Sequence, residues 1–349
     1  MPGSAGMAPS AARTVADLGE HALLDRLRAR VPPAPAWVAL GIGDDAAVFE
    51  PAPNELVVAT TDTLVEGVHF DPRLATFADL GHKALAVNLS DLAAMGATPR
   101  AALLSLALPD AVAVVDFDAL VDGFLAAAAA AGVALVGGNL ARSPGPLVVD
   151  VTALGSVRRR RVLGRSGGRP GDELYVSGTI GGATAALEWL SAAAAGDPAG
   201  EPPPATIARY RRPQARVRLG VVVGRTRSAG ACMDLSDGLA DAVRQMAAAS
   251  GTGARVEAGA VPLDPGARAW FERHGRGPLE AALAGGEDYE LLFAVPPRRR
   301  RSFLAATRLA RPIEVTRIGA LTREPAVVLA DSRGESPLPE GFAHFRGGR

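Results

Sequence analysis

Acidic residues recur in small-residue surroundings at five places in this sequence of 349 residues. The five segments are 41–45 (GIGDD), 60–63 (TTDT), 88–91 (NLSD), 234–238 (DLSDG) and 285–289 (GGEDY). Taken alone, each segment is explained by a turn, a helix cap or an exposed polar face. If the segments converge, their carboxylates repel one another unless cations lie between them, and oxygen ligands select Mg²⁺ or Mn²⁺ over zinc. The pattern therefore favours a magnesium site built from distant segments.

The elements predicted around these segments explain how polar side chains reach such a site. Asp62 directly follows a predicted buried strand over 56–61, and its threonine neighbours offer hydroxyl oxygens to a hard cation. Asn88 and Asp91 lie three residues apart in a predicted helix and so share one face of it. Residues 137–139 (GGN) follow another predicted strand, where glycine permits either close approach of the backbone to a ligand or only a tight turn.

The basic residues exclude one common way of binding a nucleotide. Lys+Arg and Asp+Glu both number 37, so the formal net charge is 0. Lys83 is the only lysine and stands in GHKA, so the chain lacks the Gly-Lys-Ser/Thr of a P-loop. A nucleotide is then expected to be held through metal ions, with arginine and glycine backbone as helpers. Whether Lys83 is structural or faces a phosphate stays open.

Composition argues against nucleic-acid and membrane partners. The arginine tetrads at 158–161 and 298–301 have no interleaved aromatic residues, so we interpret them as solvated surface. The longest apolar run, 124–138, is mostly alanine and too short to span a bilayer. The single cysteine, Cys232, excludes an internal disulfide and a cysteine-based zinc site. The first ten residues lack the features of a signal peptide, so we expect a cytoplasmic protein.

Strands that alternate with helices indicate a mixed α/β (α+β) chain of two domains. We expect a disordered lead over 1–17, an N-terminal domain over 18–157 and a C-terminal domain over 158–349. The first domain is predicted to contain helices over 18–30, 80–95 and 114–131 and strands over 56–61, 102–108, 133–136 and 147–154. The second is predicted to contain strands over 173–177, 289–295 and 313–318 and helices over 181–190, 214–223, 239–249 and 302–309.

Eight motifs follow one another in order over about residues 19–345. They are GIGDDAAVF, TTDTLVEGVHF, HKALAVNLSDLAAMGATP, GGN, GRSG, GDELYVSGTIG, MDLSDGL and GGEDYELLF. Together they resemble the thiamine-monophosphate kinase family of the AIR-synthetase-related ATP-binding superfamily. The resemblance implies a two-domain AIR-synthetase-like fold, whose N-terminal mixed α/β domain binds ATP and Mg²⁺ and forms a homodimer. It implies ATP-dependent phosphorylation of thiamine monophosphate to thiamine diphosphate by direct γ-phosphoryl transfer with several Mg²⁺ ions.

The resemblance also assigns roles to residues that match the motifs of the family. The expected magnesium ligands are Asp45, Thr60, Thr61, Asp62, Asp91, Asn139, Asp234 and Asp237. The residues expected to contact ATP are Gly138, Asn139, Arg165 and Ser236. The residues expected to hold thiamine monophosphate are His69, Glu287 and Phe342. Many members of the family have Asp where this chain has Asn139, whose amide oxygen ligates Mg²⁺ without adding charge.

The implied chemistry needs no general base. The acceptor is a phosphate monoester with a second pKa of about 6, so it is largely dianionic at neutral pH. We therefore expect no histidine to be essential for proton transfer. The alternatives are an aminoimidazole ribonucleotide synthetase type of enzyme, against which GGEDYELLF counts, and a non-catalytic nucleotide sensor, which Asn139 alone suggests.

Overall fold

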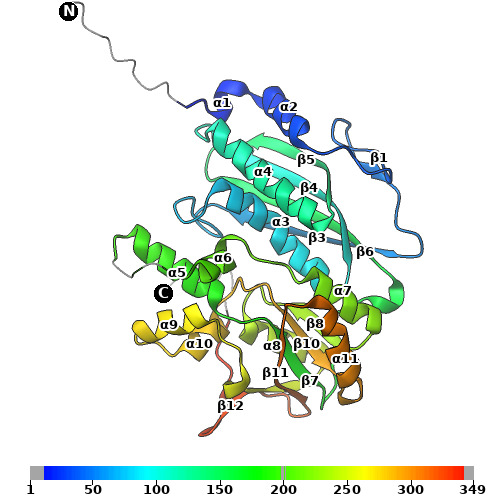
Figure 1. Cartoon of the computed structure of the whole chain (residues 1–349), viewed down its shortest axis with the longest axis vertical. Helices are drawn as coiled ribbons and strands as arrows, with labels where there is room; N and C mark the ends of the chain where they lie inside the picture. Colours follow the sequence, from blue (N-terminus) through cyan, green and yellow to red (C-terminus); the bar gives the residue numbers. More distant parts are fainter. Residues whose placement is uncertain (1–11, 198–199, 201, 342–349) are drawn as a thin grey trace, which may run out of the picture.

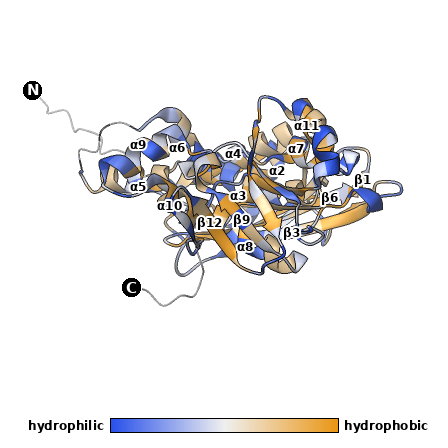
Figure 2. Ribbon diagram, turned by 90° about the horizontal axis from the view of Figure 1, so that it is seen from below, coloured by the Kyte–Doolittle hydropathy of each residue, from blue (hydrophilic) through white to orange (hydrophobic). Residues whose placement is uncertain are grey.

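The computed structural model describes residues 12–197, 200 and 202–341, and it confirms the predicted mixed α/β class. Two large sheets lie one below the other in Figure 1, with helices beside both of them. Figure 2 shows that strands such as β12 are mostly hydrophobic, whereas outer helices such as α9 and α11 carry many hydrophilic residues. This distribution is expected for sheets that form the core and helices that shield it from water.

The N-terminal sheet has four strands in the order β3-β6-β4-β5. β3 pairs antiparallel with β6 along its whole length, and β4 pairs parallel with β5. Helices α3 and α4 cover one face, where Leu85, Leu92, Phe117 and Phe124 are fully buried. The elements of this half are α1 (Val15–Leu18), α2 (Glu20–Arg30), β1 (Val38–Leu40), β2 (Val48–Phe49), β3 (Leu56–Val65), α3 (Phe77–Ala94), β4 (Thr98–Leu108), α4 (Val114–Ala131), β5 (Ala134–Arg142) and β6 (Val148–Val157).

Two glycines bring helices α3 and α4 into close contact. A Cβ on Gly81 would lie 2.0 Å from the carbonyl oxygen of Leu120, and one on Gly123 would lie 2.0 Å from that of Ala78. Each glycine therefore meets the backbone of the opposite helix, which leaves no room for a side chain. This contact helps to fix the position of α3, the helix that carries Asp91.

The C-terminal sheet has seven strands in the order β13-β12-β9-β11-β7-β10-β8. Helix α8 packs on one face, and α7 and α11 pack on the other. The strands are β7 (Glu173–Ser177), β8 (Ala231–Asp234), β9 (Gly253–Glu257), β10 (Leu291–Val295), β11 (Val315–Thr322), β12 (Val327–Asp331) and β13 (Gly334–Pro337). The helices are α5 (Gly182–Ala194), α6 (Pro204–Arg211), α7 (Val217–Thr226), α8 (Leu239–Ser250), α9 (Pro265–Arg273), α10 (Pro278–Ala284) and α11 (Arg300–Thr307).

Several predicted boundaries differ from the structure. The helix expected over 18–30 is interrupted at Gly19, where φ is +74°, and residues 15–17 of the expected lead form α1 together with Leu18. Residues 1–11 of that lead lie outside the described residues. The strand expected over 56–61 continues to Val65 because β6 pairs with it throughout. Asp62 therefore lies inside a strand rather than after one.

Helix α3 connects the two halves of the chain. Its residue Ser90 donates a hydrogen bond to Asp234 Oδ2 at the end of β8, over 2.8 Å. A Cβ on Gly220 of α7 would lie 1.9 Å from the carbonyl oxygen of Ala93, so α7 packs directly on the backbone of α3. The two sheets are thus held together through one buried helix. Within the described part of the chain, no helix is long and apolar enough to cross a membrane.

Candidate functional site

A cavity of about 480 Å³ lies where β3 and α3 face the C-terminal domain. Four of the five acidic segments contribute to its wall. The polar residues that line it are Asp62, Thr63, His69, Asp91, Thr184, Asp234, Ser236, Asp237, Glu287 and Tyr289. The structure therefore brings together side chains that are separated by more than 200 positions in the sequence, as the metal interpretation requires.

The N-terminal side of the cavity is built by a strand and a helix that pack against each other. Thr60, Asp62 and Leu64 alternate along the face of β3 that is turned to α3. The hydroxyl of Thr60 donates a hydrogen bond to Asp91 of α3. Asp91 lies on the same face of α3 as Asn88, which is fully buried and whose Oδ1 has no hydrogen-bond partner among the described residues. Oxygen acceptors therefore predominate on this wall.

The buried carboxylates repel one another. Burial, and then the charges of Asp91 and Asp150, raise the pKa of Asp62 to about 6. Burial, and then the charge of Asp91, raise the pKa of Asp234 to about 7, although Ser90 and Arg165 favour its ionised form. A site that holds like charges in a poorly solvated place is stabilised when a cation enters it. The donor set is oxygen only, which suits Mg²⁺.

The arrangement suits metal ions that are shared with a ligand. Among the described residues, no three His, Cys, Asp or Glu side chains are placed to hold one metal ion by themselves. Mg²⁺ is usually held by one or two carboxylates and completes its shell with water and substrate phosphates. Asp62, Asp91 and Asp234 fit that pattern, because each lines the same cavity from a different element.

We expect Asp234→Asn to raise the melting temperature in EDTA, because the amide removes a charge that is fully buried among other carboxylates. The amide oxygen can still accept the hydrogen bond of Ser90. Each kcal/mol gained raises the melting temperature by roughly 2–4 °C for a domain of about 150–250 residues, the size of the expected C-terminal domain that contains Asp234. Addition of Mg²⁺ and ATP is expected to raise the melting temperature of Asp234→Asn less than that of the unmodified protein. Glu324→Gln, an exposed acid without an ion pair among the described residues, is the control, and a lower melting temperature for Asp234→Asn in EDTA contradicts the repulsion.

Two loops interlock to place Glu287 at the cavity. The N–H of Glu287 donates to the carbonyl oxygen of Ser236 over 2.7 Å, and that of Tyr289 donates to Leu235 over 3.0 Å. A Cβ on Gly286 would lie 2.6 Å from Ser236 O, so only glycine fits between the loops. Glu287 itself has a φ of +64°, a region that non-glycine residues seldom adopt. Such a conformation persists where the surroundings enforce it.

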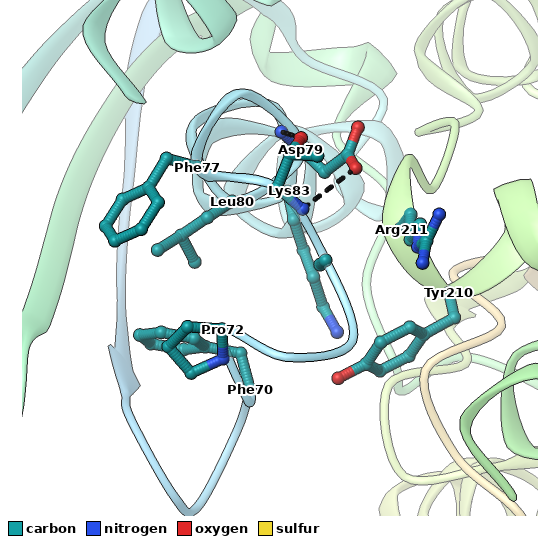
Figure 3. Close-up of a pocket in the computed structure, with 10 residues that line it drawn as sticks. Phe70, Pro72, Phe77, Asp79, Leu80, Lys83, Tyr210 and Arg211 are labelled. Carbon is teal, nitrogen blue, oxygen red and sulfur yellow. Dashed lines mark hydrogen bonds between the residues drawn. The ribbon is translucent and has the colours of Figure 1, made fainter. Parts of the chain in front are cut away.

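Lys83 lies behind Glu287 in a separate, narrow pocket. Figure 3 shows its side chain extending from α3 between Tyr210 and the pair Phe70 and Pro72. The ammonium lies 2.8 Å from Glu287 Oε1 and 4.1 Å from the centre of the Tyr210 ring. The lysine side chain is only 4% exposed, and Glu287 is 28% exposed. Lys83 therefore holds the carboxylate of Glu287 from the protein side, while Glu287 faces the cavity.

The two other acids of GGEDYELLF form a buried network that sequence reasoning missed. Asp288 Oδ2 accepts the N–H of Gly181, ahead of α5, over 2.7 Å. Burial raises the pKa of Asp288 to about 7, although Arg209 opposes the rise. Glu290 is fully buried and accepts from Arg216 Nε at 2.7 Å and from Arg209 Nη1 at 2.8 Å. The sequence does carry a signal for this network. Glu290 stands between Tyr289 and Leu291, and an acid among apolar residues needs a cationic partner once it is buried.

The structure brings further predicted residues to the cavity. Ser236 and Asp237 line it, and so does His69. Nδ1 of His69 accepts the N–H of Val65 over 3.1 Å, so the proton of a neutral ring resides on Nε2. Arg165 does not line the cavity; it donates to Gln245 of α8 over 2.7 Å.

Other predicted residues lie elsewhere. Asp45 is exposed between β1 and β2, and Thr61 faces the opposite side of β3, where it contacts Thr152. Gly138 and Asn139 are exposed inside β5 rather than after a strand. A Cβ on Gly138 would lie 1.8 Å from Leu104 O, so this glycine is required by the pairing of β5 with β4. Phe342 lies outside the described residues.

Comparison with known proteins decides the family. Residues 43–157 match the model of the AIR synthase related protein N-terminal domain, and residues 169–332 match that of the C-terminal domain. A thiamine-monophosphate kinase of Rhodopirellula baltica is 36% identical over 93% of this chain and 97% of its own length. That of Escherichia coli K12 is 38% identical over 94% of this chain and 98% of its own length. The chain belongs to the thiamine-monophosphate kinase family.

Solved structures of the thiamine-monophosphate kinase family agree with this fold. The crystal structure of the Stenotrophomonas maltophilia K279a kinase has a TM-score of 0.77 and 39% identity, over 89% of this chain and 96% of its own. AaThiL complexed with AMPPCP and TMP has a TM-score of 0.73 and 33% identity, over 96% of this chain and all of its own. The AIR-synthetase-like two-domain fold expected from the motifs is therefore confirmed.

Proposed function

We propose that this chain transfers the γ-phosphoryl group of ATP to the phosphate of thiamine monophosphate, giving thiamine diphosphate and ADP. The observation that carries the proposal is the single cavity in which Asp62 and Asp91 of one domain face Asp234 and Glu287 of the other. Relatives named for this reaction cover nearly the whole chain. AaThiL was solved in complex with AMPPCP, an analogue of ATP, and TMP, so a relative of this chain binds both substrate classes.

The proposed transfer depends on alignment of two polyanions. Bound Mg²⁺ would neutralise and bridge the phosphates, which is the main requirement of phosphoryl transfer. Asp62, Asp91 and Asp234 would hold the ions, with Asp237 beside them at the start of α8. Thr60 orients Asp91 by its hydrogen bond. Because the acceptor phosphate is already dianionic, no residue needs to remove a proton, and His69 serves the substrate only by contact.

The family resemblance assigns ligand roles to Arg165, as a contact of ATP, and to four other residues outside the cavity lining, and we retain all of them as part of the proposal. Asp45, Thr61 and Asn139 remain proposed Mg²⁺ ligands, and Gly138 remains, with Asn139, a proposed contact of ATP. All four lie exposed on strands or on the loop between β1 and β2. They are accessible to a bound nucleotide or to a second copy of the chain.

A homodimer is supported by the open face of the N-terminal sheet. Helices α3 and α4 cover one face. On the other, β1 and β2 pack against part of β4, β5 and β6, but β3 exposes Val57 to 60% along with Ala59, Thr61 and Thr63. An apolar strand face of this kind is generally covered in the functional state. We propose that a second copy of the chain covers it. We also expect the enzyme in the cytoplasm, where ATP is available.

We expect Glu287→Gln to raise the KM for thiamine monophosphate about 10-fold or more, as a charged hydrogen bond of about 1.5–3 kcal/mol is lost. The carboxylate is placed to face the cationic substrate, so the KM for ATP should not change. Steady-state kinetics with each substrate varied in turn make the comparison. Glu324→Gln is the control, because Glu324 is an exposed acid that does not line the cavity. An equal rise of both KM values places Glu287 outside the thiamine subsite.

One assay tests the proposed function. Purified protein is incubated with ATP, thiamine monophosphate and Mg²⁺, and thiamine diphosphate is separated and quantified. We expect one thiamine diphosphate for each ADP formed. ATP binding without any product would instead support a nucleotide sensor, and ATP use only with an aminoimidazole ribonucleotide precursor would support the synthetase alternative.

A further inference from the structure

A second cavity, of about 440 Å³, is lined by four arginines and by no acidic residue. It lies between the end of α7, the start of α11 and the segment that links the two domains, which includes a 3₁₀ turn (Arg159–Arg161). Figure 1 shows α7 and α11 side by side at this place. The lining residues with charge or hydroxyl groups are Arg160, Arg161, Arg227, Arg299, Thr226 and Ser302.

Half of the other arginines in the described part of the chain form ion pairs with carboxylates, and these four do not. Arg26, Arg209 and Arg300, for example, form ion pairs with Asp118, Glu290 and Glu173. Within residues 12–197, 200 and 202–341, none of the four cavity arginines forms an ion pair. Two of the four are in contact, because Arg299 Nη1 donates a hydrogen bond of 2.9 Å to the carbonyl oxygen of Arg227. Like charges gathered in a concavity create a positive potential that attracts anions.

The frame of this cavity is fixed by backbone contacts. A Cβ on Gly224 of α7 would lie 2.7 Å from the carbonyl oxygen of Arg161, so the linking segment packs directly on that helix. The N–H of Leu163 donates to the carbonyl oxygen of Met95 at the end of α3 over 3.1 Å. Arg227 ends α7 in a left-handed conformation, with φ of +51°. The arginines are therefore presented by three elements that are packed together, and not by a free loop.

We propose that this second cavity binds small molecules that carry a chain of two or more phosphate groups. Guanidinium groups match pairs of phosphate oxygens, and a cavity of about 440 Å³ with four of them on its wall has room for more than one phosphate group. No aromatic residue lines the cavity, so it offers no platform on which nucleic-acid bases could stack. This site needs no metal ion, in contrast to the carboxylate-lined cavity, and it does not depend on the proposed function.

The test separates the two cavities by removing metal ions. In EDTA, the carboxylate-lined cavity repels polyanions, so calorimetric titration with inorganic tripolyphosphate reports on the arginine-lined cavity. We expect saturable binding to the unmodified protein, weakened about 10-fold or more in Arg160→Gln/Arg299→Gln, since charged hydrogen bonds contribute about 1.5–3 kcal/mol each. Arg301→Gln/Arg308→Gln is the matched control, because both residues are exposed near the same helix and lie outside the cavity lining. Melting curves check that both variants are folded.

The outcomes distinguish the occupants. Diphosphate, ATP and thiamine diphosphate are titrated in the same way. Similar affinities mean that the phosphate chain alone is recognised. A much tighter complex with one of them identifies that molecule as the natural ligand. Equal weakening in both double variants would show unspecific attraction and overturn the proposal. Absence of binding to the unmodified protein in EDTA also overturns it. So does tighter, arginine-dependent binding of an oligonucleotide, which would make the site a nucleic-acid surface.

Discussion

Asp91→Asn is expected to slow phosphoryl transfer by about 10²–10³-fold, the range seen when one preorganised group that stabilises charge is removed. Asp91 lies between the acids of the two domains: it accepts the hydroxyl of Thr60, and its charge raises the pKa of both Asp62 and Asp234. An amide at this position can still bind a cation, but it contributes no charge to balance it. The loss should therefore appear in kcat and in the Mg²⁺ concentration that gives half-maximal rate.

The Asp91 variant needs two controls. Asp122→Asn removes an acid from the exposed surface of α4 and should leave the rate unchanged. A urea transition measured in EDTA should show that Asp91→Asn folds at least as stably as the unmodified protein, since a like charge has been removed from the site. Full activity of Asp91→Asn at ordinary Mg²⁺ concentrations would remove Asp91 from the metal site.

Glu290→Gln is expected to lower the free energy of unfolding by about 3–5 kcal/mol, the cost of breaking a buried ion pair by removing one partner. Glu290 is completely buried and is the shared acceptor of Arg209 and Arg216. Without the charge of Glu290, the guanidinium groups of Arg209 and Arg216 remain in the interior and lack the carboxylate that they share. Urea unfolding followed by tryptophan fluorescence measures the change.

The control for Glu290 is Glu324→Gln, because that residue is exposed and near none of these arginines. Surface changes of this kind usually alter stability by less than about 0.5 kcal/mol. If Glu290→Gln also lowers the free energy of unfolding by less than about 1 kcal/mol, Glu290 does not stabilise the fold as the shared partner of a buried ion pair. Because Glu290 directly follows Tyr289 at the cavity wall, a larger effect on stability than on KM distinguishes support of the fold from contact with substrate.

Local patterns predicted the elements well where hydrophobic spacing and stop signals agree. The helix expected over 114–131 coincides with α4, which ends at a left-handed Gly132, and the strand expected over 173–177 coincides with β7. Strand β8 was missed because its four residues, Ala231–Asp234, include no β-branched or aromatic side chain. β3 and β5 run beyond their expected ends because pairing with neighbouring strands, which local sequence does not reveal, extends them.

The carboxylates of the candidate site were predictable from the sequence, but the residues that pack around them were not. Asp62, Asp91, Asp234 and Glu287 were singled out from their sequence context, and they line one cavity. The ion pair of Lys83 with Glu287 was not foreseen, since the two residues are 204 positions apart in the chain. The arginine tetrads are largely exposed, as expected, but their meeting across α7 and α11 depends on the tertiary fold.

The central claim is that carboxylates from both domains hold metal ions that carry the phosphates of ATP. Anomalous diffraction from crystals grown with Mn²⁺ and a non-hydrolysable ATP analogue tests it directly, because Mn²⁺ takes the same oxygen ligands as Mg²⁺. We expect anomalous peaks in the cavity at about 2.1 Å from carboxylate oxygens of Asp62, Asp91 or Asp234, with phosphate oxygens completing the shell. A nucleotide bound with no peak beside any of these three residues would contradict it.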